Sequence, residues 1–192
     1  MPGRRYMSQR QDYSADSAVY ITLAIHMISR DSITHDLLDC DGSCRDINFG
    51  ERINKVGATG IINFLASEWT LKQAMTGDGE ELALEELPNL FDRALGTVST
   101  VWHGSKSPNH LQAFLCWSVP SEIFCEVTFF PEDLNKTQFM LENFLVFVSK
   151  LVGASGTSEY YVRYEDASWR HGNAKTNDGV IFSHENFMLP NG

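Results

Sequence analysis

The sequence has few basic residues, no long apolar run and no recognisable catalytic motif. Its 192 residues contain 15 Lys and Arg against 25 Asp and Glu, which gives a formal net charge of −10. Charge of this sign repels nucleic acid and anionic membranes and attracts basic partners. No apolar run approaches the roughly 18 residues that a membrane-spanning helix needs. These shortages argue against a protein that binds nucleic acid or membranes, and they identify no reaction.

A secretion signal is also missing. The best candidate, residues 19–28 behind Arg4, Arg5 and Arg10, is interrupted by His26 and has no small-x-small cleavage site. We therefore expect a cytoplasmic protein. It has four cysteines, too few for a disulfide scaffold in a chain of this length, and we expect them to be reduced.

Metal-binding patterns fail around Cys40 and Cys44. If Gly42 takes the sixth position of a calcium loop, the first and twelfth positions fall on Leu37 and Asn48, where Asp and a bidentate Glu are required. A zinc site needs four ligands in closely spaced pairs, and no second such pair is present. We predict no metal and no cofactor.

The apolar pattern predicts both strands and helices. Strands are predicted by alternation at residues 19–27, 111–119, 123–130, 159–165 and 180–183. Helices are predicted by apolar spacing at residues 48–66, 78–95 and 137–152. Gly57 and Gly60 are expected to break the first helix into two pieces, and Pro88 to divide the second into a short and a longer helix. Residues 30–46 are expected to be mainly loop.

These elements do not alternate as repeated βαβ units. The order favours an α+β fold with a mainly antiparallel sheet and helices packed on one face. Residues 1–16 are polar and basic without periodicity, which indicates a flexible leader. No linker or repeat divides the remainder, so residues 17–192 are predicted to form a single α+β domain.

The hairpin predicted at residues 111–130 brings two cysteines close together. If its loop has two or four residues, Cys116 and Cys125 lie directly opposite each other, and such neighbours can be bridged in an oxidising compartment. Two reduced cysteines in the core are the favoured interpretation, because a free thiol packs as a small apolar group.

Catalytic candidates among the six histidines are poorly supported. His103 and Ser105, in the segment Trp-His-Gly-Ser, combine a base with a nucleophile, but residues so close in a chain seldom face each other. A loop at the end of a helix explains this segment better. A small hydrolase or transferase that uses His103 or His184 with a carboxylate remains an alternative.

Acidic side chains and one strand supply the candidates for partner binding. Tyr161 and Arg163 share one face of the strand at 159–165, and both residue types are enriched at binding hot spots, so a core strand and an interface both stay open. The acidic candidates gather in two stretches and are Asp39, Asp41 and Asp46 in the first and Glu80, Glu81, Glu85 and Glu86 in the second.

Three segments resemble immunity proteins of bacterial polymorphic-toxin and contact-dependent growth inhibition systems. They are EYYVRYEDASW at 159–169, GVIFSH at 179–184 and FFPEDL at 129–134 after an apolar hairpin. The resemblance implies a small cytoplasmic protein that holds a cognate toxin domain without catalysis. A basic toxin suits an acidic inhibitor, because complementary charge speeds association. A non-catalytic adaptor whose acidity serves only solubility is a further alternative.

Overall fold

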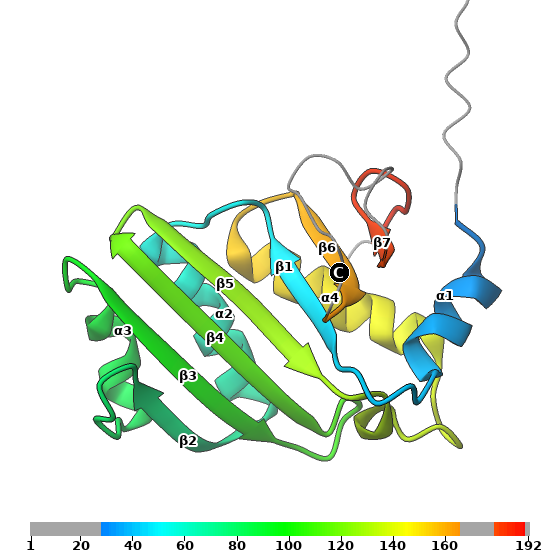
Figure 1. Ribbon diagram of the computed structural model, residues 1–192, viewed down its shortest axis with the longest axis horizontal. Helices are drawn as coiled ribbons and strands as arrows, with labels where there is room; N and C mark the ends of the chain where they lie inside the picture. The colour runs from blue at the N-terminus through cyan, green and yellow to red at the C-terminus, as the bar shows by residue number, and fades with distance from the viewer. Residues whose placement is uncertain (1–27, 166–178, 191–192) are drawn as a thin grey trace, which may run out of the picture.

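The computed structural model describes residues 28–165 and 179–190. Within these residues, seven strands form one antiparallel sheet in the order β2-β3-β4-β5-β1-β6-β7 (Figure 1). The strands are β1 (Arg45–Phe49), β2 (Thr70–Thr76), β3 (Gly96–His103), β4 (His110–Val119), β5 (Glu122–Phe129), β6 (Tyr160–Tyr164) and β7 (Val180–Ser183). The helices are α1 (Arg30–Leu38), α2 (Lys55–Glu68), α3 (Leu87–Leu90) and α4 (Leu141–Ser155), with 3-10 turns η1 (Leu84–Glu86) and η2 (Pro131–Leu134).

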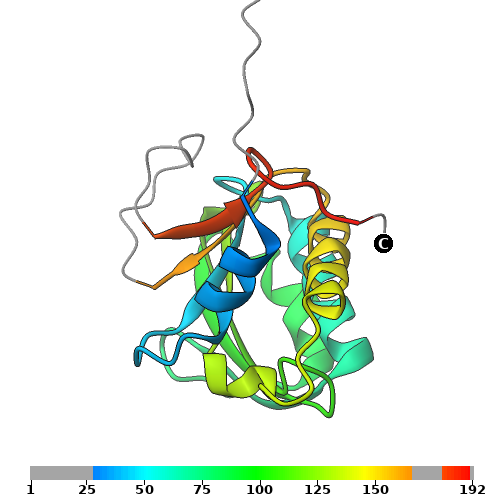
Figure 2. The same ribbon diagram turned by 90° about the vertical axis from the view of Figure 1, so that its right-hand side faces the viewer.

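The helices α2 and α4 lie side by side on one face of the sheet, and α1 closes one end of the layered structure (Figure 2). Alternate residues of the long strands face these helices, among them the buried Val98, Trp102, Leu115 and Val127. The predicted α+β class, with a mainly antiparallel sheet and helices on one face, is confirmed. No helix in the described residues is long and apolar enough to cross a membrane.

Several predicted elements are confirmed with small changes of boundary. The hairpin is β4 and β5, and the last two strands are β6 and β7. The helix predicted at 137–152 is α4, whose Phe144, Phe147, Val148 and Leu151 are buried as the apolar stripe requires. Met140 is exposed instead, because it is the N-cap residue and lies outside the helix.

The predicted break in the first helix is wrong. α2 runs without interruption over 14 residues, and its two glycines are points of contact with α4. A Cβ atom on Gly57 would lie 2.0 Å from the carbonyl oxygen of Ser155, and one on Gly60 would lie 2.2 Å from that of Ala154. Glycine is required here because the two helix backbones approach too closely for any side chain between them.

The many aspartates of residues 30–46 led us to expect mainly loop, and this expectation is wrong. Ser29 caps α1 by accepting a hydrogen bond from the amide of Ser32, and Ile33 and Leu37 on one side of the helix are fully buried. Residues 45–49 form a central strand, so the helix expected from residue 48 begins only at Lys55. Two buried apolar residues one turn apart are enough to dock a helix that is otherwise polar.

Strands β2 and β3 were not predicted from the sequence. The longer helix that was expected after Pro88 does not form. α3 has one turn, and the chain enters β3 at Gly96. The segment Trp-His-Gly-Ser therefore ends a strand, not a helix. Trp102 is buried and donates its indole N–H to Thr100, while Gly104 packs on the ring of Trp69.

The hairpin register separates the two cysteines. Cys116 is paired with Phe124, and Cys125 with Leu115, because an irregularity next to Val119 shifts the ladder by one residue. Successive strand residues point to opposite faces, so the two thiols lie on opposite sides of the sheet and both cysteines are free. The predicted leader at 1–16 and strand at 19–27 lie outside the described residues, and the single domain at 17–192 stays a prediction.

Candidate functional site

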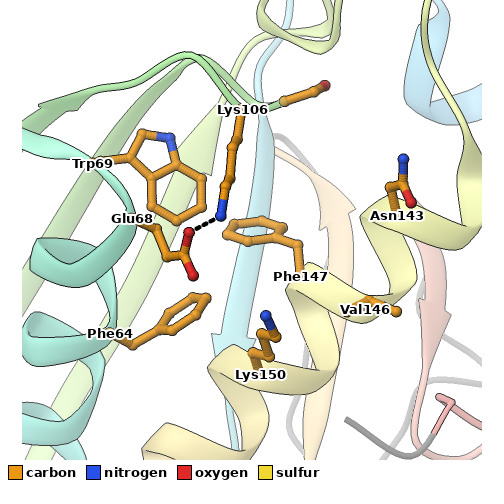
Figure 3. Close-up of a pocket in the computed structure, with 9 residues that line it drawn as sticks. Phe64, Glu68, Trp69, Lys106, Asn143, Val146, Phe147 and Lys150 are labelled. Atoms are coloured by element: carbon orange, nitrogen blue, oxygen red, sulfur yellow. Dashed lines mark hydrogen bonds and ion pairs between the residues drawn. The ribbon is translucent and has the colours of Figure 1, made fainter.

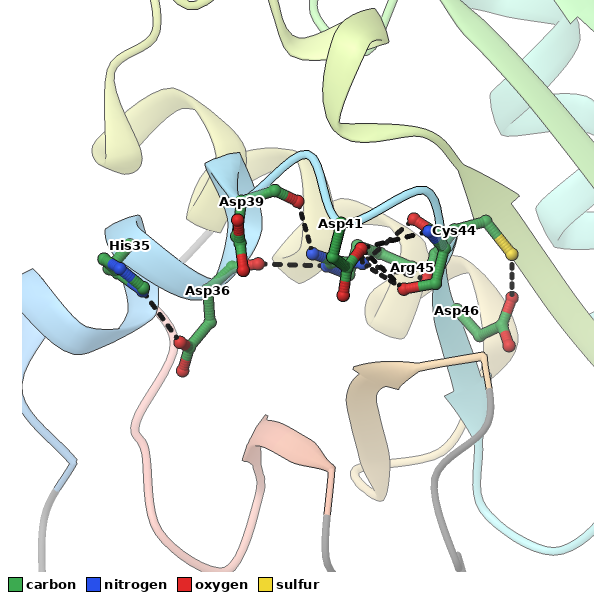
Figure 4. A network of polar contacts seen from close by, with 8 residues as sticks. His35, Asp36, Asp39, Asp41, Cys44, Arg45 and Asp46 are labelled. Atoms are coloured by element: carbon green, nitrogen blue, oxygen red, sulfur yellow. Dashed lines mark hydrogen bonds and ion pairs between the residues drawn. The ribbon is translucent and has the colours of Figure 1, made fainter.

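The first acidic stretch is a loop wrapped around Arg45, whose side chain is fully buried. Its guanidinium donates hydrogen bonds to the backbone carbonyls of Asp36 and Asp39 at 3.0 and 2.7 Å, and to the carboxylate of Asp41 at 3.3 Å (Figure 4). It also donates to the hydroxyl of Ser43 at 2.9 Å. One buried cation thus fixes the path of the loop.

One exposed carboxylate of this loop, that of Asp41, is held in a defined position, and the backbone of the other, Asp39, is fixed. Asp41 accepts hydrogen bonds from the backbone amide and the hydroxyl of Ser43, and these bonds together with Arg45 lower its pKa. Asp39 is exposed, and only its backbone oxygen is occupied by Arg45. A loop that is ordered before binding loses less conformational entropy when a partner arrives. Both residues are therefore suitably placed for a basic partner.

Asp46 does not belong to that exposed set, because its side chain is buried on the sheet face away from the helices. It accepts a hydrogen bond from Thr128 at 2.7 Å and lies 3.1 Å from Nη2 of Arg163. The same Nη2 is 2.6 Å from Glu126, so two carboxylates share one guanidinium. Burial, with the charge of Glu126 as the next cause, raises the pKa of Asp46 to about 6.

Tyr161 and Arg163 are also buried, and the possibility that they present an interface is not supported by their positions. Tyr161 is 0% exposed and Arg163 is 8% exposed. Arg163 donates to Asn48 at 2.9 Å and to the carbonyls of Tyr164 and Glu165. Alternation predicts that these two residues share a face, but it does not show that this face of the strand is covered.

The second acidic stretch lies between β2 and β3 and is exposed. Glu80, Glu81, Glu85 and Glu86 all face solvent, and Arg93 approaches only Glu80, at 3.4 Å. Glu86 accepts a hydrogen bond from the amide of Ala83, so its carboxylate stabilises the start of η1. In the described part of the chain, no cation forms an ion pair with Glu81 or Glu85.

A hollow accompanies this second stretch. It has a volume of about 420 Å³ and is bordered by Asp78, Leu90, Arg93, Leu95 and Trp117. Leu95 is 70% exposed, so this hollow has an exposed apolar side chain on the same rim as the acidic Asp78. Apolar centres with charged rims are common in protein interfaces.

Figure 1 places α1 and α3 at opposite ends of the molecule, so the two acidic surfaces do not form one site.

The described histidines do not form an enclosed site with a carboxylate; His35 lies 3.2 Å from Asp36 but is exposed on α1. His103 and His110 are cross-strand neighbours with ring centroids 4.5 Å apart, and His110 Nδ1 lies 4.0 Å from Asp133. The crevice at His110 and Asp133 has no room for a water molecule. His184 Nδ1 lies 3.2 Å from the carbonyl oxygen of Tyr160. The arrangement gives the hydrolase alternative no support in this part of the chain.

The part of the chain that the structure describes has no geometry that would support a metal site. No three His, Cys, Asp or Glu side chains gather there as a site. Cys40 is exposed whereas Cys44 is buried, and Cys44 Sγ lies 3.9 Å from Asp46. Burial raises the pKa of Cys44 to about 12, which opposes the thiolate form that binds metals. Absence of metal and cofactor stays a prediction.

Comparison with known proteins finds likeness in structure and none in sequence. No protein-family model matches the chain, and no curated protein matches it. The fold is similar to that of a chain in the crystal structure of the toxic C-terminal tip of CdiA from Pseudomonas aeruginosa in complex with immune protein. The TM-score is 0.53 at 14% sequence identity, and the match covers 77% of this chain and 97% of that one. The chain therefore shares its fold with a component of a toxin–immunity complex.

Proposed function

We propose that this chain is an immunity protein, which binds a cognate toxin domain and neutralises it by covering the toxin's active or substrate-binding surface. The shared fold supports this proposal, and charge favours the role of inhibitor over that of toxin. A toxin that acts on nucleic acid needs a basic surface, whereas this chain has a net charge of −10. Opposite charges speed the encounter and select the partner.

The exposed acidic surface between β2 and β3 is the observation that carries the proposal. Glu81 and Glu85 are exposed, Leu84 between them in the chain is also exposed, and a further exposed leucine, Leu95, follows ten residues after Glu85. In the loop at residues 39–45, by contrast, Arg45 neutralises part of the acidic charge. We therefore place the toxin-binding surface at residues 78–97, with Asp39 and Asp41 as the comparison surface. The proposed site of action is the cytoplasm.

Charge reversal at Glu81 and Glu85 tests this assignment. Both carboxylates lack ion pairs in the described residues, whereas Glu80 contacts Arg93 and Glu86 caps a turn, so Glu81→Lys with Glu85→Lys should leave the fold intact. We expect association with the cognate toxin domain to slow by about tenfold at low salt. The salt dependence of the rate should also become weaker.

The matched control reverses two exposed aspartates at the other end of the molecule. Asp31→Lys with Asp39→Lys changes the total charge by the same amount, and both side chains are exposed. We expect this control to slow association less than the variant at Glu81 and Glu85. Equal slowing by the two variants would show that only net charge matters, and the surface assignment would be wrong.

A further inference from the structure

A cavity of about 360 Å³ lies between α2, α4 and the loop that joins β3 to β4 (Figure 3). It shares no residue with either acidic surface, and its lining differs from theirs in chemical character. Its walls include three aromatic rings and two lysines, in a chain that is otherwise acidic. Cavities of about 300 to 1,000 Å³ with apolar walls and a few polar groups are typical binding sites for small molecules.

The aromatic wall is formed by Phe64 of α2, Trp69 and Phe147 of α4. Ring centroids are 5.4 Å apart for Trp69 and Phe147 and 6.0 Å apart for Phe64 and Trp69. Trp69 is fixed in orientation, because its indole N–H donates to the carbonyl of Pro108 at 2.8 Å and Gly104 packs on its ring. A Cβ atom on Gly104 would lie 2.5 Å from Cδ1 of that ring. The apolar wall is therefore preformed.

The charged groups of the cavity leave one positive charge in excess. Lys106, from the loop, forms an ion pair with Glu68 of α2. Lys150 extends from α4 on the other side, and no acidic side chain of the described chain pairs with it (Figure 3). The cavity thus has an apolar floor, to which the half-buried Phe64 and the 6% exposed Trp69 and Phe147 contribute, and an uncompensated ammonium group at its rim. This pair of features matches a ring that carries an anion.

We infer that this cavity binds an aromatic carboxylate, with the ring against Phe64, Trp69 and Phe147 and the carboxylate on Lys150. The ligand is either a free aromatic acid or the carboxyl-terminal aromatic residue of a peptide, since both present the same groups. The volume admits one ring system of indole size and not a folded domain. This site is independent of the toxin-binding surface proposed above, because the two share no residue.

Calorimetric titration of the full chain with four probes tests the inference. The anionic probes are indole-3-acetate and N-acetyl-Gly-Gly-Trp with a free carboxyl terminus, and the neutral controls are indole-3-acetamide and the same peptide as its carboxyl-terminal amide. We expect at least one acid to bind several-fold more tightly than its amide, with the Trp69 indole N–H signal shifting in NMR spectra. Tighter binding of the acetate identifies a free acid as the ligand class, and tighter binding of the peptide identifies a carboxyl terminus.

Two lysine variants locate the binding. Lys150→Met keeps the apolar stem and removes the charge, and we expect it to weaken binding of the preferred acid by about threefold to fivefold, as for a partly exposed ion pair. Lys72→Met on β2, an exposed lysine that does not line the cavity, should bind as the parent does. The inference fails if both amides bind as tightly as the acids, if no probe binds, or if the two variants are indistinguishable.

Discussion

The guanidinium carbon of Arg45 lies 4.0 Å from the centre of the Tyr164 ring, so the first residue of β1 is joined to the last residue of β6 by a cation–π contact. The N–H donors of the same guanidinium bind the carbonyl of Asp36 at the end of α1 and the carbonyls of Asp39 and Ser43 in the acidic loop that follows. One side chain thus connects the sheet to a candidate binding surface. No other residue type combines a permanent positive charge with five N–H donors in one plane.

Replacing Arg45 should therefore be costly. We expect Arg45→Met to lower the free energy of unfolding by about 2 to 4 kcal/mol, because one buried and three part-buried carbonyls lose their donor. Arg52→Met is the matched control: Arg52 is exposed, its guanidinium lies 5.6 Å from the Phe124 ring, and the expected loss is below about 1 kcal/mol. Urea unfolding measures both. Equal losses would show that the loop does not depend on Arg45.

The contact between α2 and α4 gives opposite expectations for two glycines. Gly60→Ala should lower the free energy of unfolding by about 2 kcal/mol or more, because the new Cβ atom meets the carbonyl of Ala154. Gly153→Ala should raise it by about 0.5 to 1 kcal/mol, because this helical position has no atom within 4 Å of the added Cβ. Thermal unfolding distinguishes the two. A neutral Gly60→Ala would contradict the close approach of the helices.

Asp46 should give stability a defined dependence on pH. Its pKa in the folded chain is raised to about 6, above the ordinary value of 3.8, so the folded state holds its proton more tightly than the unfolded state. Its contribution is fully present below about pH 4 and is lost as pH rises through about 6, an effect on the order of 1 to 3 kcal/mol. Asp46→Asn removes this titration.

Unfolding curves at several pH values measure that difference. From pH 4 to pH 7 the parent should lose stability relative to Asp46→Asn. Asp133→Asn is a suitable control, since this carboxyl is also mostly buried, with a side-chain exposure of 16% against 4% for Asp46, but lies outside the group that shares Arg163. A parent and Asp46→Asn with parallel pH profiles would exclude the raised pKa.

A fourth expectation concerns the single domain at 17–192. Deletion of residues 1–16 should leave Tm almost unchanged, and unfolding followed by tryptophan fluorescence and by far-ultraviolet circular dichroism should give one coincident transition. Two separate transitions, or two proteolytic fragments that are each stable, would show that the chain has more than one cooperative unit.

Prediction from sequence succeeded where one face alone is apolar and failed where tertiary contacts decide. β4, β5 and α4 have strong periodic patterns and were predictable. β1 does alternate, with Ile47 and Phe49 on its apolar face, but it has only five residues and falls between an aspartate-rich segment expected to be loop and a segment expected to be helix from residue 48. β3 also alternates, with Val98, Thr100 and Trp102 buried, so its sequence does contain the signal of a strand.

The candidate site was partly predictable for the same reason. Exposure of Glu80, Glu81, Glu85 and Glu86 follows from their charge, since such residues are seldom buried without a partner. Burial of Asp46 and Arg163 could not be read from the sequence, because Asp46 and Arg163 are 117 residues apart and pair only through the β1–β6 ladder. The cavity at Trp69 depends on a helix pair and a loop, and no local pattern indicates it.

The most direct test of the proposed function is to mix the purified chain with its cognate toxin domain and to measure both binding and toxin activity. We expect a one-to-one complex with a Kd of about 10 nM or tighter and complete loss of toxin activity at equimolar chain. Absence of a complex at micromolar concentrations, with the toxin fully active, would contradict the proposal that this chain is an immunity protein.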